Sequence, residues 1–125
     1  MSYSILIVDD TAILAEAIAD MLRMEDLRVT LSSNGLEALA VLEHQRHDLI
    51  ISDLRMPVMG GIEFIKRVRK NDSQHRTPII VLSAQAEEAS KRECIQAGAN
   101  LFLTKPFDEQ ELLSSIKKFL DERQS

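Results

Sequence analysis

Three acids, one hydroxyl and one amine follow four short apolar runs of this sequence, each where its run ends. Asp9 and Asp10 follow the first run, and Asp53, Ser83 and Lys105 follow three later ones. Neighbouring carboxylates repel one another, and a divalent cation with a nearby ammonium group relieves that repulsion. Oxygen ligands without His or Cys favour Mg²⁺ over zinc. With the metal on two of the acids, the third, held by Lys105, is suited to attack phosphorus, because phosphoryl transfer needs charge screening and donors for the phosphoryl oxygens.

The elements that position these side chains alternate regularly between strand and helix patterns. Apolar runs predict strands over residues 4–8, 28–32, 49–52, 79–82 and 101–104. Helical periodicity predicts helices over residues 11–24, from Gly35 onward, over 62–70 and 87–97, and from Asp108 to about Glu122. Short connections between them favour right-handed βαβ units, hence an α/β fold with a doubly wound, mostly parallel sheet covered on both faces. The carboxyl ends of all strands then meet at one edge, which brings the five side chains together.

Several local signals fix the expected helices. Asn34 with Glu37, and Asp108 with Glu111, read as helix caps, and Gly98 reads as a left-handed helix end. The side chains expected to face the core are Ile13, Leu14, Ala17, Ile18, Met21 and Leu22 in the first helix and Leu36, Leu39, Ala40 and Leu42 in the second. The basic residues Lys66, Arg67, Arg69 and Lys70 are expected to form a solvated face of the third helix.

Composition narrows the class of protein. The 125 residues are 45% hydrophobic, which suits one domain over residues 1–125. The net charge of −5 and the lack of a basic run argue against direct nucleic-acid binding. The run at residues 5–8 is too short for a signal peptide or a membrane span. A single cysteine, Cys94, fits a reducing compartment, so we expect a soluble cytoplasmic protein.

The combined pattern resembles a known family. The pair Asp9 Asp10, Asp53 followed by Met56 Pro57, Ser83 Ala84, and Lys105 Pro106 Phe107 is similar to the response-regulator receiver domain of two-component signalling. The resemblance runs from about Ile5 to Leu120, and it implies a five-stranded sheet of order 2-1-3-4-5, an order that is a general property of chemotaxis receivers.

The resemblance also implies a role for each site residue. Asp53 would accept a phosphoryl group from a histidine kinase or a phosphotransfer protein. Asp10, Asp53 and the backbone carbonyl of Arg55 would bind Mg²⁺, with Asp9 acting largely through water. Lys105 would pair with the phosphoryl group, and its bond to Pro106 would be cis.

The same resemblance implies a switch that reaches the partner surface. Ser83 would donate to a phosphoryl oxygen, and Phe102 would be the aromatic switch residue. The surface that changes would be the fourth helix, fifth strand and fifth helix, where a partner protein or a second copy of the chain would dock. Ser83 stands where Thr is more usual and Phe102 where Tyr is frequent. Arg55 and Gln85 occupy positions that influence how fast the acyl phosphate hydrolyses.

Two other functions fit parts of the pattern. One is a Mg²⁺-dependent phosphatase with an aspartyl-phosphate intermediate, of the haloacid-dehalogenase type. Members of that class carry a second acid two residues after the nucleophile, and this chain has Arg55 at that position. The other is an interaction module that is never phosphorylated. Against that function, the chain keeps every residue that the family uses as phosphoryl acceptor, metal ligand or lysine.

His44 and His47, three residues apart, lack a third ligand nearby in the sequence and do not indicate a metal site.

Overall fold

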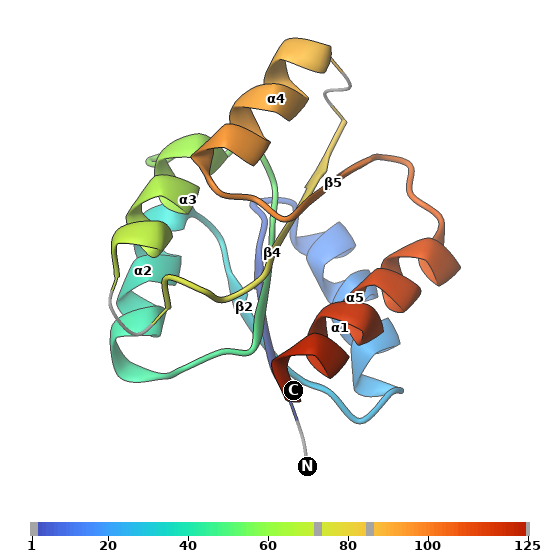
Figure 1. Cartoon of the computed structure of the whole chain (residues 1–125). Helices are drawn as coiled ribbons and strands as arrows, with labels where there is room; N and C mark the ends of the chain where they lie inside the picture. Colours follow the sequence, from blue (N-terminus) through green and yellow to red (C-terminus); the bar gives the residue numbers. More distant parts are fainter. Residues whose placement is uncertain (1–2, 72–73, 85–86, 125) are drawn as a thin grey trace.

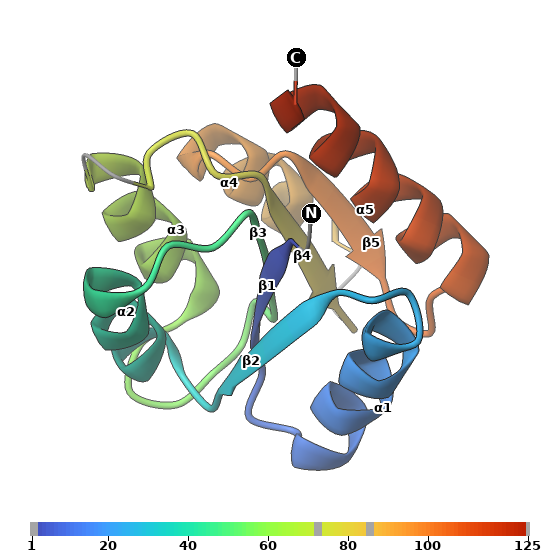
Figure 2. The same ribbon diagram turned by 90° about the horizontal axis from the view of Figure 1, so that it is seen from below.

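One parallel sheet forms the middle of the molecule. In the computed structural model, which describes residues 3–71, 74–84 and 87–124, five strands pair in the order β2-β1-β3-β4-β5 (Figure 2). They are β1 (Ser4–Val8), β2 (Arg28–Ser32), β3 (Leu49–Ser52), β4 (Ile79–Ser83) and β5 (Leu101–Thr104). The predicted α/β fold and its strand order are confirmed, and β4 extends by one residue to include Ser83.

Helices cover both faces of the sheet. They are α1 (Ala12–Arg23), α2 (Gly35–His44), α3 (Gly61–Lys70), α4 (Glu88–Ala97) and α5 (Glu109–Gln124). Helices α1 and α5 lie on one face, and α2, α3 and α4 lie on the other (Figures 1 and 2). Within the described ranges, no helix is both long enough and apolar enough to cross a membrane.

Alternate residues of each inner strand pack into two separate hydrophobic cores, one on each face of the sheet. Ile5 and Ile7 pack with the helices α1 and α5, whereas Leu6 and Val8 pack with α2 and α3. All four are at most 1% exposed. A strand buried on both faces needs an unbroken apolar run rather than an alternating one, which is why β1, β3 and β4 read as continuous hydrophobic segments.

Strand register sets the level of the polar residues at the sheet edge. Val8 lies level with Ser52 in the neighbouring strand, so the residues that follow, Asp9 and Asp53, leave the sheet side by side. Ser83 lies level with Thr104, which places Lys105 just beyond Ser83. The backbone N–H of Lys105 donates to the Ser83 carbonyl at 2.8 Å, so this pairing extends one residue past the strand.

Helix ends follow the predicted caps. Asn34 Oδ1 accepts from the Glu37 N–H at 2.8 Å at the start of α2. Asp108 Oδ1 accepts from the backbone N–H groups of Gln110 and Glu111 at the start of α5. Gly98 ends α4 with φ +125°, a conformation that L side chains rarely adopt.

The inward face of α2 differs from the predicted one. Leu36 is 53% exposed and Ala40 is exposed, whereas Ala38 is fully buried. The buried stripe is Gly35, Ala38 and Leu42. A Cβ at Gly35 would lie 3.1 Å from Met59 and Phe64 atoms, so small residues let this helix approach the neighbouring loop and α3 closely. Ile13 and Ala17 of α1 are also wrong as core residues, because Ile13 is 86% exposed and Ala17 is exposed as well.

Arg69 departs from the predicted solvated face of α3. Its side chain is half-buried and makes hydrogen bonds to the carbonyl oxygens of Gly98 and Thr77 at 3.0 and 2.8 Å. It also donates to the His75 carbonyl and to Asn100 Oδ1. The guanidinium group therefore joins α3 to the loops that enter β4 and β5.

Candidate active site

The carboxyl edge of the sheet gathers the three acids. Ligand atoms of Asp9, Asp10 and Asp53 all lie within 4.8 Å of one another. Asp9 is buried at 7% exposure, Asp53 is partly buried, and Asp10 is exposed. Among the described residues, these three form the one group of His, Cys, Asp or Glu side chains close enough to share a metal ion.

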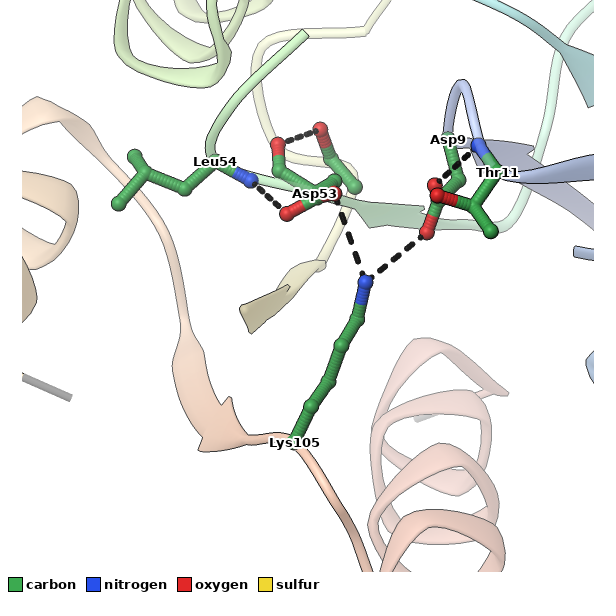
Figure 3. Close-up of polar contacts among 6 residues, drawn as sticks. Asp9, Thr11, Asp53, Leu54 and Lys105 are labelled. Atoms are coloured by element: carbon green, nitrogen blue, oxygen red, sulfur yellow. Dashed lines mark hydrogen bonds and ion pairs between the residues drawn. The ribbon is translucent and has the colours of Figure 1, made fainter. Parts of the chain in front are cut away.

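Lys105 bridges two of these acids. Its Nζ donates to Asp9 Oδ2 at 3.2 Å and to Asp53 Oδ2 at 3.4 Å (Figure 3). The three side chains are only 17%, 5% and 13% exposed, respectively, so water screens their attraction weakly. The Lys105–Pro106 peptide bond is cis.

Backbone groups hold the carboxylates in place. The Thr11 N–H donates to Asp9 Oδ1 at 2.8 Å, and the Leu54 N–H donates to Asp53 Oδ1 at 2.7 Å (Figure 3). The buried Ser52 hydroxyl donates to the Asp53 carbonyl at 2.9 Å. Sequence reasoning missed these supports, because a backbone donor has no side-chain signature and Ser52 reads as an ordinary strand residue.

The electrostatics of the site favour protonation of Asp53. Burial is the largest cause and raises the pKa of its carboxyl group, because ionisation is costly away from water. The Lys105 ammonium lowers that pKa, and the Asp9 carboxylate raises it again. The net pKa is raised, so Asp53 sits where an added cation would be favourable.

An open cleft of about 510 Å³ lies over these groups. Its lining residues are Thr11, Asp53, Arg55, Ser83, Ala84 and Lys105. The Ser83 side chain is nearly fully buried, whereas Arg55 is exposed. Gln85, the expected counterpart of Arg55 beside the site, lies outside the described residues. The cleft thus brings together Asp53, Ser83 and Lys105, as predicted from the strand ends.

The loop from β3 to α3 is pressed against Asp53. A Cβ at Gly61 would lie 2.5 Å from the Asp53 carbonyl oxygen, closer than real Cβ contacts. The Gly61 N–H also donates to the Leu54 carbonyl at 2.8 Å. Glycine at this position therefore lets α3 begin directly behind Asp53.

Phe102 lies away from the acids, in the middle of β5. It is level with Val81 in β4 and packs, half-buried, against the core on the α2–α4 face. Val81 is two residues before Ser83. Phe102 therefore lies on the same pair of strands, β4 and β5, whose ends carry Ser83 and Lys105.

His47 and Cys94 have roles outside the site. His47 is buried, and its ring nitrogens lie 3.2 Å from the Gln45 carbonyl and from Thr30 Oγ1, whereas His44 is exposed. Cys94 is fully buried, and burial raises the pKa of its thiol to about 11. Both side chains are buried in the structure, and neither belongs to the acidic cluster.

The donor set fits a magnesium ion. The acidic cluster offers three hard carboxylate oxygens without His or Cys. The raised pKa of Asp53 reflects an uncompensated cost of placing its negative charge here, and a divalent cation would relieve that cost.

Comparison with known proteins gives the same assignment over nearly the whole chain. The response regulator receiver domain family matches residues 5–117. The phosphate regulon transcriptional regulatory protein PhoB of Pseudomonas aeruginosa is 37% identical over 117 residues, 94% of this chain and 51% of that protein. The hybrid signal transduction histidine kinase M of Dictyostelium discoideum is 40% identical over 93% of this chain and 5% of that protein. The chain spans about half the length of the transcriptional regulators that it matches.

Solved structures share both the fold and part of the sequence. The chemotaxis protein CheY4 of Vibrio cholerae is 34% identical with a TM-score of 0.90, covering 95% of this chain and 99% of that one. The receiver domain of the sensor histidine kinase PA1611 from Pseudomonas aeruginosa is 36% identical with a TM-score of 0.89, covering 97% and 99%. That structure has a magnesium ion in its active-site cleft. By sequence family, strand order and overall structure, this chain belongs to the response regulator receiver domains of two-component signalling.

Proposed function

We propose that this chain is a signalling switch that accepts a phosphoryl group on Asp53 and then changes its surface to control a partner. The observation that carries the proposal is the bridge from Lys105 to both Asp9 and Asp53 inside the cleft. Receiver domains take phosphoryl groups from histidine kinases, and a histidine kinase or phosphotransfer protein is the donor expected here. We further propose that it works in the cytoplasm and acts on no separate substrate as an enzyme.

The transfer itself requires little covalent chemistry from the protein. An Asp53 carboxylate oxygen forms a bond to phosphorus while the bond from phosphorus to the donor's imidazole nitrogen breaks, and the electron pair leaves with that nitrogen. Lys105 remains beside the phosphoryl oxygens and offsets their charge. The raised pKa of Asp53 in the free protein means that its charge is poorly compensated before a cation and the donor arrive.

Asp10, Asp53 and the Arg55 backbone carbonyl are the groups proposed to hold Mg²⁺, with Asp9 acting through water. When bound, the ion supplies charge screening for the phosphoryl oxygens. Both Asp9 oxygens are already engaged, one by the Thr11 N–H and the other by Lys105. The exposed Asp10 carboxylate can therefore exchange a bound water for a metal ion more easily than Asp9 can.

The switch needs more than one contact. Moving a two-state equilibrium from 1:99 to 99:1 takes roughly 5.5 kcal/mol of differential stabilisation. A hydrogen bond from Ser83 to a charged phosphoryl group contributes about 1.5–3 kcal/mol, so Lys105 must contribute as well. Their joint movement opens space for the Phe102 ring to turn inward, which alters α4, β5 and α5. A partner protein or a second copy of the chain would dock on this surface.

The test is incorporation of phosphoryl groups from a small phosphodonor. Wild-type protein with acetyl phosphate and Mg²⁺ should gain the mass of one phosphoryl group. Asp53→Asn should gain none at that site, and chelator should suppress the gain in the wild type. Equal labelling of wild type and Asp53→Asn would reject the assignment of the acceptor, and full labelling in chelator would reject the metal.

A further inference from the structure

Arg69 makes hydrogen bonds to segments at the edge of the sheet where the strands begin, opposite the edge that carries the cleft. Its Nε donates to the Gly98 carbonyl at 3.0 Å, its Nη1 to the Thr77 carbonyl at 2.8 Å, and its Nη2 to Asn100 Oδ1 at 2.9 Å. Asn100 Oδ1 also accepts from the Ile79 N–H at 2.9 Å. Gly98 and Asn100 join α4 to β5, and Thr77 precedes β4. One side chain of α3 thus fixes the end of α4 and the starts of two strands.

Helix α4 is held unequally at its two ends. Its one buried residue, Cys94, lies in its second half, and the first half has none. At its carboxyl end, the Gly98 and Ala99 N–H groups donate to the Cys94 carbonyl, and the Asn100 N–H donates to the Ile79 carbonyl. Helix segments with few buried contacts open at low cost, so the amino half is the looser part.

The loose end of α4 is the end nearer the cleft. Strand β4 ends at Ser83 beside Asp53, and the chain then leads into the amino end of α4. The helix runs back along the sheet and ends beside α3, which it contacts (Figure 1). A displacement that starts at Ser83 therefore reaches α4 at its loosely packed end first.

We propose that Arg69 is the fixed point about which α4 turns when Asp53 is phosphorylated. The amino half of α4 moves, while Gly98, Ala99 and Asn100 keep their positions on α3. This inference rests on the proposed function, because it describes how the same switch reaches the partner surface. Gly98 belongs to the same device, since a Cβ there would lie 2.6 Å from Arg69 Cγ and displace the side chain.

The test compares amide hydrogen exchange with and without beryllofluoride, a phosphoryl mimic, in the presence of Mg²⁺. In the wild type, beryllofluoride should change exchange in residues 88–93 and leave Gly98, Ala99 and Asn100 unchanged. In Arg69→Gln, which loses the charged fork, beryllofluoride should change exchange at those three amides by about tenfold. Arg69→Lys, which keeps the charge and part of the bonding, should show a smaller change.

A matched control lies on the same helix. Arg67 is exposed and pairs only at the surface with Glu63, at 2.8 Å, so Arg67→Gln should behave like the wild type. A purely structural role for Arg69 would raise exchange at Gly98–Asn100 equally with and without beryllofluoride, and that result would overturn the inference. A wild type whose largest change falls at Gly98–Asn100 would overturn it too. Failure of the wild type to bind beryllofluoride at all would instead count against the proposed function.

Discussion

The fold holds Asp53 where ionisation of its carboxyl group is unfavourable. Burial raises the pKa of the carboxyl group despite the nearby Lys105 ammonium. A folded pKa above the unfolded value means that the stabilisation is complete below the unfolded pKa, about 3.8, and is lost as the pH rises through the folded pKa. At neutral pH the ionised side chain therefore lowers the free energy of unfolding. Such a cost is common where function requires a charge in a partly buried site.

We expect Asp53→Asn to be more stable than the wild type at pH 7 without Mg²⁺. The amide keeps the shape of the side chain and an oxygen for the Leu54 N–H, but carries no charge. Urea unfolding measures the difference, and Asp121→Asn, at an exposed position of α5, is the control. The advantage should shrink as the pH falls below the folded pKa of Asp53. An Asp53→Asn variant that is less stable at pH 7 would contradict this account of the electrostatics.

Magnesium should make the wild type more stable than Asp53→Asn. Binding to the native state alone stabilises a protein by about 2.7 kcal/mol when the ligand concentration is 100 times its Kd. The wild type should therefore gain stability as Mg²⁺ is added, whereas Asp53→Asn should gain little. Thermal unfolding at rising Mg²⁺ concentration measures this gain. Equal gains in both proteins would place the metal away from Asp53.

At the scale of elements, the close approach of α3 to β3 depends on one glycine. Gly61→Ala would put a Cβ 2.5 Å from the Asp53 carbonyl oxygen, which is backbone and cannot turn aside. Overpacking of this kind costs about 1–3 kcal/mol, so we expect a loss of that size in urea unfolding. Gly60→Ala is the matched control, since its Cβ would meet nothing closer than 3.8 Å. Equal effects of the two substitutions would show that the loop can shift freely.

The elements also show which features a sequence can predict. Strand ends and caps follow from local patterns, and the parallel sheet follows from the handedness of βαβ units, so together they predicted how the acidic cluster assembles. The strand order was expected from the family resemblance and not from these patterns. The inward face of α2 did not follow, because Gly35 and Ala38 face the core through close approach rather than through hydrophobicity. Arg69 was misjudged for a similar reason. Its acceptors are carbonyl and amide oxygens far away in the sequence, and no periodic pattern indicates them.

At the scale of the whole molecule, His47 links the edge strand β2 to the loop before β3. Its buried ring lies between the Thr30 hydroxyl and the Gln45 carbonyl. Burial lowers the pKa of His47, and the nearby Asp48 carboxylate offsets this only in part. The unfolded chain therefore binds the proton first as the pH falls below about 6.5, which makes the folded state progressively less stable.

We expect this histidine to set part of the acid sensitivity of the fold. The free energy of unfolding of the wild type should fall between about pH 7 and about pH 5, and His47→Asn should fall less steeply over the same range. His44→Asn, at an exposed position of α2, should follow the wild type. Parallel pH curves for wild type and His47→Asn would contradict the role given to this ring.

The central proposal for the whole molecule is that Asp53 receives the phosphoryl group, and chemical trapping tests it most directly. Borohydride reduces an acyl phosphate to an alcohol and leaves free carboxylates unchanged, so it converts a phosphorylated aspartate to homoserine. After treatment with acetyl phosphate and Mg²⁺, then borohydride, peptide mass spectrometry should find homoserine at position 53. Homoserine at position 9 or 10 instead, or at none of the three acids, would contradict the account.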